Sequence, residues 1–228
     1  MPQQLGLDLP SRTALGRDAF FVSPANGIAL TLIDDWPNWA GGKLVLTGPK
    51  GAGKTHLTHV WAQMTGARIV AARDLTDADV PELARSPVAV EDVPEIAGDL
   101  AAQTALFHLH NLALAERQPL LFTGTGPVAA WTLTLPDLQS RLQGANAVAL
   151  EPPDDALLSA VLVKLFADRQ LMPKADFIPF LLSRMDRSFA AASALVEALD
   201  KASLALKRPV TRRLASEVLD NPARWLTY

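Results

Sequence analysis

A glycine-rich stretch, GPKGAGKT at residues 48–55, constrains the fold of this chain more than any other part of its sequence. It fits the pattern G-x-x-x-x-G-K-[ST] and lies between an apolar run of β type, residues 43–47, and a segment with helical spacing. Glycines in such a loop let backbone N–H groups turn inward around phosphate oxygens, and the following helix adds the positive end of its dipole. The stretch therefore predicts a phosphate-binding loop between a strand and a helix.

The side chains of this phosphate loop predict a nucleotide site. Lys54 is placed to reach the terminal phosphates, and the Thr55 hydroxyl is placed to hold Mg²⁺. A glycine-rich turn that binds nothing is the alternative, which the strand–loop–helix context disfavours. The residues predicted here to bind nucleotide are Gly48, Gly51, Ala52, Gly53, Lys54, Thr55 and His56.

A second apolar run, residues 88–90, ends in the two acids Glu91 and Asp92. In ATPases with such a loop, an acid that follows a neighbouring strand holds the metal, and another residue orients the attacking water. We therefore predict Glu91 as a Mg²⁺ ligand with Thr55, and Asp92 as a catalytic residue. Because Glu91 is longer than the usual Asp, the pair favours metal-linked phosphate binding over efficient hydrolysis by this chain alone. Two solvated acids at a strand end are the alternative.

Apolar runs of β type alternate with helical segments from residue 43 to residue 150. This alternation predicts crossover connections on a parallel sheet whose strands are covered by helices on both faces, which is an α/β fold. After Pro152 and Pro153 only helical spacing remains, including a long helix from about Ser188. We predict an N-terminal tail at 1–17, a nucleotide-binding α/β core at 18–152 and a small all-helical domain at 153–228.

Composition excludes several classes of site. The sequence has no cysteine, which removes disulfides, thiolate nucleophiles and cysteine-based metal sites and fits a reducing compartment. We find neither a leader-like start nor an apolar run of about 18 residues, so we expect a cytoplasmic protein with no membrane partner. The formal net charge of -3 argues against strong direct binding to duplex DNA. The histidine pairs lack a third ligand and do not predict a metal site.

Four stretches resemble the DnaA family of AAA+ replication initiators. They are GKTHLTHVWA at 53–62, FFVSPANGIAL at 20–30, LPDLQSRL at 135–142 and VALEPPDD at 148–155. The resemblance implies an AAA+ core followed by a helical lid, with ADP or ATP and Mg²⁺ as ligands. It implies that adenine is enclosed by Phe20, Phe21, Val22 and Asn26.

The third of these stretches resembles the one that bears the arginine finger of the family, which implies that role for Arg141. A planar, permanently charged guanidinium is suited to stabilise charge that develops on the phosphates held by a neighbouring subunit. An ordinary surface arginine at a helix end is the alternative.

The N-terminal stretch QLGLDL, residues 4–9, alternates leucines as an extended strand does. With this stretch, and because the sequence ends soon after the lid where DnaA continues into a DNA-gripping domain, the chain resembles the Hda branch of the family. Hda regulators bring about hydrolysis of DnaA-bound ATP while docked on the sliding clamp, so the implied partners are DnaA and the clamp. Leucines folded back onto the same chain, or paired with a second copy, are the alternative. The implied clamp-binding residues are Gln4, Leu5, Leu7 and Leu9.

Two positions depart from the family pattern. Sensor 1 falls at Thr123 and Thr125 in place of Asn or Asp, and the sensor 2 arginine falls within residues 190–192, which are alanines. Arg184 and Arg187 are the nearby arginines. We therefore expect weak turnover by this chain itself. The other functions considered are a self-sufficient ATPase and a DnaC-like helicase loader, which would bind single-stranded DNA. A phosphate-loop kinase is disfavoured because the loop begins only at residue 48. A homodimer of this chain is a further alternative.

Overall fold

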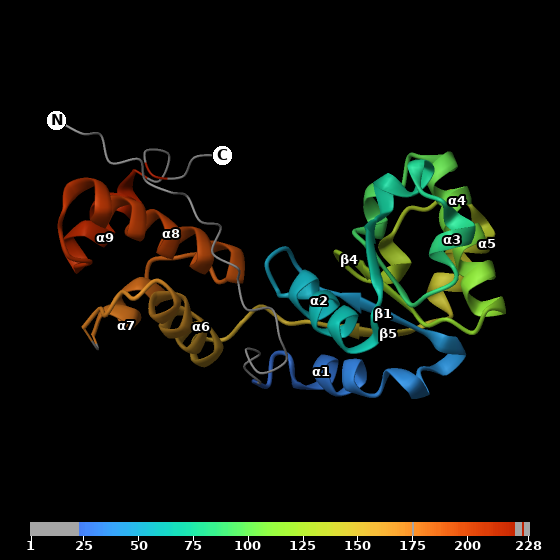
Figure 1. Ribbon diagram of the computed structural model, residues 1–228, viewed down its shortest axis with the longest axis horizontal. Coiled ribbons are helices and arrows are strands. Elements are labelled where there is room, and N and C mark those ends of the chain that lie inside the picture. Colours follow the sequence, from blue (N-terminus) through green and yellow to red (C-terminus); the bar gives the residue numbers. More distant parts are fainter. Residues whose placement is uncertain (1–22, 175, 222–224, 226–228) are drawn as a thin grey trace.

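The structure is a computed structural model that describes residues 23–174, 176–221 and 225. Its centre is a five-stranded sheet with the strand order β2-β3-β4-β1-β5 (Figure 1). Every pairing between neighbouring strands is parallel, as the alternation of strands and helices in the sequence predicts. The strands are β1 (Lys43–Thr47), β2 (Arg68–Ala71), β3 (Val88–Glu91), β4 (Leu120–Gly124) and β5 (Asn146–Ala149).

Helices cover both faces of this sheet (Figure 1). In β1 the buried residues alternate between the faces: Leu44 and Leu46 pack with α1 and α2, whereas Val45 packs with α4 and α5. The helices of the core are α1 (Gly27–Asp34), α2 (Lys54–Thr65), α3 (Val80–Leu83), α4 (Leu100–Ala115) and α5 (Pro136–Gln143). Short 3-10 turns join them: η2 (Trp36–Asn38), η3 (Ala40–Gly42), η4 (Ala72–Asp77), η5 (Val93–Ile96) and η6 (Val128–Ala130).

The covering of the sheet by helices is less complete at its edges than at its centre. The apolar residues of the central strands β1, β3 and β4 are buried, whereas no residue of β2 and only Val148 of β5 is buried. An edge strand has a neighbour on one side only, so fewer helices reach over it. The continuous apolar runs mark the centre of the sheet and do not distinguish its edges.

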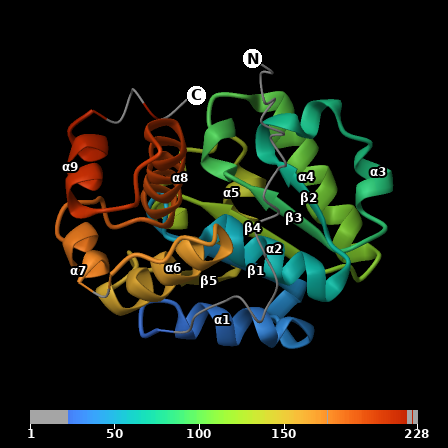
Figure 2. The same ribbon diagram turned by 60° about the vertical axis from the view of Figure 1, so that its left-hand side comes forward.

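The C-terminal helices are α6 (Asp155–Asp168), α7 (Phe177–Leu182), α8 (Phe189–Leu206) and α9 (Arg212–Asp220), and they enclose a hydrophobic cluster of their own. Leu158, Leu162 and Leu199 are fully buried in this cluster, at the helical spacing of the sequence. These helices lie beside the sheet, next to the loop that precedes α2 (Figure 2). The bounds of the three predicted parts stay a prediction. No helix in the described part of the chain is both long and apolar enough to cross a membrane.

Side-chain caps explain where several helices begin. Asp154 accepts a hydrogen bond from the Leu157 N–H at 2.7 Å and so caps α6. Ser188 accepts one from the Ala191 N–H at 3.0 Å and so caps α8. A side-chain oxygen at this position satisfies one of the N–H groups that the first helical turn leaves without a partner. The start of α8 matters for the site because it lies against the phosphate loop.

Candidate functional site

The phosphate loop connects β1 to α2 and opens into a cavity of about 530 Å³. Four parts of the chain line this cavity: the loop with the start of α2, the segment that follows β3, the segment that follows β4, and the start of α8. It therefore lies at the carboxyl ends of the parallel strands, where open α/β sheets bind ligands. Its lining residues are Lys50, Gly51, Gly53, Lys54, Thr55, His56, Asp92, Pro94, Glu95, Thr125, Phe189 and Ala190.

Two glycines shape the loop by leaving space for the start of α8. Gly51 has a φ of 77° and Gly53 a φ of 100°, a left-handed backbone that side chains disfavour. A Cβ added at Gly51 would lie 2.4 Å from the Cβ of Ser188, and one added at Gly53 would lie 3.0 Å from the Phe189 ring. The glycines are thus required both by the turn of the loop and by the close approach of the C-terminal helices.

Lys54 braces the phosphate loop from within. Its Nζ donates hydrogen bonds to the carbonyl oxygens of Gly48 and Pro49, each at 2.9 Å. Burial lowers the pKa of Lys54, and the charges of Asp92 and Glu91 oppose that shift. An ammonium has three donors, so one N–H remains for a phosphate oxygen.

The two acids at the end of β3, Glu91 within the strand and Asp92 directly after it, lie close to this lysine and differ in their surroundings. Asp92 lines the cavity and has a φ of 55°, an unusual backbone for a residue other than glycine. Its N–H donates to the Thr123 hydroxyl at 3.1 Å, which holds the turn. Among the described residues, the buried Oε1 of Glu91 has no hydrogen-bond partner. A buried carboxylate oxygen without a partner suits a cation, and the exposed Thr55 hydroxyl offers a second oxygen, so these residues fit Mg²⁺.

The two threonines considered for sensor 1 play different parts. Thr123 is buried in β4 and supports the backbone of Asp92, so its hydroxyl does not reach the cavity. Thr125 lines the cavity. Only the second of these hydroxyls is therefore placed to meet a bound phosphate.

The start of α8 closes the cavity without an arginine. The Phe189 N–H donates to the Gly51 carbonyl at 3.1 Å. Ala190, one of the three alanines among which the family resemblance places the sensor 2 arginine, lines the cavity. The nearby arginines are held elsewhere: Arg187 pairs with Asp155 at 2.9 Å, and Arg184 stacks 4.6 Å above a phenylalanine ring. No arginine from the described part of the chain lines this cavity.

Arg141 lies near the amino ends of the strands, whereas the phosphate loop lies at their carboxyl ends. It is an exposed residue in the last turn of α5, and its carbonyl accepts a hydrogen bond from Lys43 Nζ at 3.0 Å. Lys43 begins β1, whereas the phosphate loop follows the last residue of that strand. At about 3.3 Å per residue, the two ends of β1 are roughly 15 Å apart. The structure therefore does not bring Arg141 to the nucleotide site of its own chain.

The remaining predicted residues fall in several places. His56 lines the cavity, and burial and the neighbouring His59 lower its pKa. Ala52 is buried in the core under the loop, and Asn26 is buried just before α1, where its side chain accepts from the Ser23 N–H. The structure does not place Ala52 or Asn26 in the lining of the cavity. The predicted residues that lie outside the described part of the chain are Gln4, Leu5, Leu7, Leu9, Phe20, Phe21 and Val22.

Sequence reasoning missed several lining residues. Pro94 and Glu95 directly follow the acidic pair, and this proximity is a signal that could have identified them. Phe189 also lines the cavity, and the sequence has no local signal that this residue meets the phosphate loop. Its place follows from how the C-terminal helices pack on the core.

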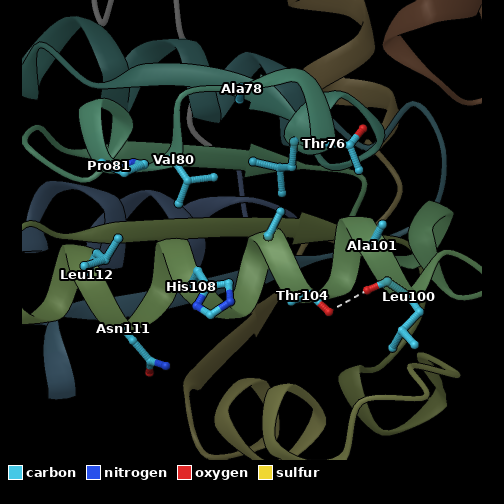
Figure 3. Close-up of a pocket in the computed structure, with 12 residues that line it drawn as sticks. Thr76, Ala78, Val80, Pro81, Leu100, Ala101, Thr104, His108, Asn111 and Leu112 are labelled. Carbon is cyan, nitrogen blue, oxygen red and sulfur yellow. Dashed lines mark hydrogen bonds between the residues drawn. The ribbon is translucent and has the colours of Figure 1, made fainter.

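A larger hollow of about 1010 Å³ lies between α4 and the segment formed by η4 and α3, and it shares no lining residue with the phosphate-loop cavity (Figure 3). Leu100 and Leu112 mark its length on α4, and Val80 faces them from α3. No Asp, Glu, Lys or Arg of the described chain lines it. Because the chemistry of phosphate binding requires charged groups and inward-facing N–H groups, the smaller cavity is the candidate site.

Comparisons with known proteins agree on the fold. No protein-family model matches the chain. Domain III of the replication initiation protein DnaA from Thermotoga maritima is 17% identical with a TM-score of 0.78, over 91% of this chain and 96% of that one. AMPPCP-bound DnaA from Aquifex aeolicus is 19% identical with a TM-score of 0.67, over 79% of this chain and 62% of that one.

A third similar structure is a replication initiator DnaA bound to AMPPCP and single-stranded DNA, 18% identical with a TM-score of 0.68 over 80% of this chain. This chain spans 63% of the length of that protein. At such identities the likeness shows the fold alone, which is that of DnaA domain III. The predicted fold class, a parallel α/β core followed by helices, is confirmed.

Proposed function

We propose that this protein binds an adenine nucleotide and regulates replication initiation as Hda proteins do, by supplying Arg141 to ATP held by DnaA while docked on the sliding clamp. The observation that carries the proposal is the separation of Arg141 from the phosphate loop of its own chain. Arg141 is exposed, and its guanidinium has no hydrogen bond or ion pair with any residue of the described chain. A cation so placed is available to a neighbouring molecule and not to its own nucleotide.

Nucleotide binding is supported by the build of the cavity. Backbone groups of Gly51 and Gly53, the free N–H of Lys54 and the Thr55 hydroxyl would receive the phosphates, with Mg²⁺ between Thr55 and Glu91. The metal, when bound, neutralises charge on the phosphates. Two of the similar DnaA structures are bound to AMPPCP, an analogue with an adenine base, which favours ADP or ATP as the ligand here.

Weak turnover by the chain itself follows from what lines the cavity. Ala190 and Thr125 line the cavity, so this side of it offers one hydroxyl and neither the arginine nor the amide or carboxylate that the family resemblance leads us to expect. Electrostatic stabilisation of the transferring phosphoryl group is the main part of such catalysis. A site without these groups retains its ligand better than it hydrolyses it, which suits a regulator whose bound nucleotide sets its shape.

Docking on the sliding clamp rests on the sequence alone, because the residues proposed for it lie outside the described part of the chain. Leu5, Leu7 and Leu9 would seat in apolar pockets while the extended backbone adds hydrogen bonds, with Gln4 as a polar anchor. The association and ordering costs of such a short peptide limit its affinity. The clamp then serves to concentrate this protein beside DnaA. The net charge of -3 argues against strong duplex binding by this chain itself.

The test is a reconstituted reaction with ATP-loaded DnaA, clamp loaded on DNA, and this protein with ADP. Arg141→Ala is expected to reduce the stimulated rate by about 10³-fold or more, since arginine fingers supply 10³ to 10⁵ in rate. Arg213→Ala is the matched control, because Arg213 is exposed in the C-terminal helices and pairs only at the surface. Undiminished stimulation by Arg141→Ala would remove the proposed function. Tight binding of a single-stranded oligonucleotide by the wild type would favour a helicase loader instead.

A further inference from the structure

One lysine, Lys43, joins three elements at the amino ends of the strands, where Arg141 also lies. Lys43 is the first residue of β1, and its Nζ is 3.1 Å from His110 Nε2 on α4. The same Nζ donates to the carbonyl oxygen of Arg141 on α5 at 3.0 Å. A strand, a helix of the covering layer and the helix that carries Arg141 are thus held together by a single ammonium group.

The roles within this cluster follow from the donors available. An ammonium has donors only, so His110 Nε2 must be the acceptor and the ring must be neutral. The other ring nitrogen, Nδ1, then carries the proton and donates to the Asn111 side chain at 3.3 Å. His110 is fully buried, and burial lowers its pKa to about 4, with the charges of Lys43 and Arg141 acting in the same direction. The acceptor is therefore present at neutral pH.

The hydrogen bond from Lys43 falls where α5 needs one. The last four carbonyls of a helix have no partner within it, and a cation near that end is favourable. Leu138 and Leu142 of α5 are fully buried, so the helix is fixed along one side by packing. Lys43 adds a fixed point at the residue whose exposed side chain is proposed to act on a partner.

We propose that Lys43 is a positioning residue for Arg141: supported by His110 as acceptor, it fixes the backbone from which the Arg141 guanidinium projects. This inference rests on the proposed role of Arg141. A displacement of about 1 Å in a group of this kind is enough to cost on the order of 10²-fold in rate. Lys43 makes no contact with phosphates in this arrangement, because it lies at the other end of β1 from the phosphate loop.

The test uses Lys43→Met, which retains most of the aliphatic stem and removes every donor. In the reconstituted reaction its maximal stimulated rate is expected to fall 10-fold to 100-fold. The concentration of this protein that gives half-maximal stimulation, and its affinity for ADP, should not change. Lys174→Met, which removes an exposed lysine, is the matched control and should behave as the wild type. Lys43→Arg retains donors and should restore at least half of the lost rate.

A second measurement does not depend on the proposed function. The amide N–H groups of Gly144 and Ala145 bond to the last turn of α5. Their hydrogen-exchange rates are expected to rise at least 10-fold in Lys43→Met relative to the wild type and to Lys174→Met. Unchanged exchange would overturn the anchoring role itself. If Lys43→Met proves too unstable to assay, Lys43→Gln, which retains one donating group, should show a smaller loss of rate in the same direction.

The outcomes separate the two claims. If Arg141→Ala stimulates fully, the proposed function fails whatever Lys43→Met does. If Arg141→Ala loses stimulation while Lys43→Met or Lys43→Gln retains the full rate, the positioning role fails and the proposed function stands. Lys43→Met could instead reach the full maximal rate but require a higher concentration for half-maximal stimulation. That result would also overturn the positioning role, because it would indicate that Lys43 makes a docking contact.

Discussion

At the scale of single residues, three basic side chains have different surroundings. Lys54 is turned onto the carbonyls of its own loop, Lys43 onto the end of α5, and Arg141 into solvent. The sequence identifies Lys54 and Arg141 through motifs. It has no signal for Lys43, because the three elements that meet there are far apart along the chain.

Lys54→Ala should weaken binding of both ADP and ATP by at least about 10-fold, because it removes a charge-assisted hydrogen bond to the phosphates. Isothermal titration calorimetry measures both affinities directly. Lys174→Ala serves as the control for loss of a lysine elsewhere. Equal affinity in Lys54→Ala and the wild type would show that the cavity is not the nucleotide site.

His110 should make the fold sensitive to acid. Its pKa lies at about 4 when folded, below the ordinary value of 6.5, so the unfolded chain binds a proton first as the pH falls. The stability it contributes is present above pH 6.5 and is lost between pH 6.5 and about 4. From pH 7 to pH 5 this loss is about 2 kcal/mol. The charged groups that face the ring are Lys43 and Arg141.

His110→Gln provides the measurement, because glutamine retains an acceptor for Lys43 and does not titrate. Urea unfolding at pH 7 and pH 5 should show a smaller loss of unfolding free energy in the variant than in the wild type. His56 also has a lowered pKa and titrates in both proteins, so the difference between them isolates His110. An identical pH dependence in the two proteins would contradict the prediction.

At the scale of elements, the start of α8 makes two interactions that both depend on its exact backbone conformation. Ser188 caps the helix, and the next residue bonds to the phosphate loop through Gly51. Both require that the backbone changes from extended at Ser188 to helical at Phe189. The segment therefore connects the stability of the C-terminal helices to the shape of the nucleotide site.

Ser188→Ala should lower the free energy of unfolding by about 1 kcal/mol, because it removes the N-cap of α8. Urea denaturation followed by circular dichroism gives the value. Ser159→Ala is the matched control: Ser159 lies inside α6, bonds back to the Asp155 carbonyl, and alanine is the better helix former there. Similar effects of the two substitutions would mean that the cap contributes nothing specific.

The elements themselves are largely predictable from the sequence, whereas their meeting points are not. Alternating apolar runs, the loop glycines and the leucine spacing of α6 and α8 are local signals, and each gave the observed element. The exposed edges of β2 and β5, the burial of Thr123 under Asp92, and the contact of Phe189 with the loop depend on how distant segments pack. No pattern within a window of a dozen residues contains that information.

At the scale of the whole molecule, the phosphate-loop cavity and Arg141 lie at opposite ends of the parallel strands. The cavity lies at the carboxyl ends of the strands, Arg141 at their amino ends, and the predicted clamp-binding stretch in the N-terminal segment outside the described residues. A protein arranged in this way can hold its own nucleotide while it contacts other proteins elsewhere. The same separation allows each surface to be tested without disturbing the others.

Replacing Gln4 and Leu7 together with alanine should abolish binding to the sliding clamp. Each buried leucine is worth roughly 1.5 to 3 kcal/mol, which is a large share of the modest affinity expected of a short peptide. Surface plasmon resonance measures binding to the immobilised clamp. The control is the melting temperature, which should change little. A large fall in melting temperature with clamp binding intact would indicate that these residues belong to the fold.

The hydrogen bond from the Phe189 N–H to the Gly51 carbonyl ties the first turn of α8 to the phosphate loop, so any tilt of the helix about this point would be largest at its far end. The helix has 18 residues and is therefore about 27 Å long. A tilt of about 10° about this point would carry the Leu206 end through about 5 Å, by the geometry of a rigid rod of that length. Leu204, 72% exposed, lies near that far end. A small change of tilt at the phosphate loop would thus move the exposed Leu204 by several times as much as it moves the loop.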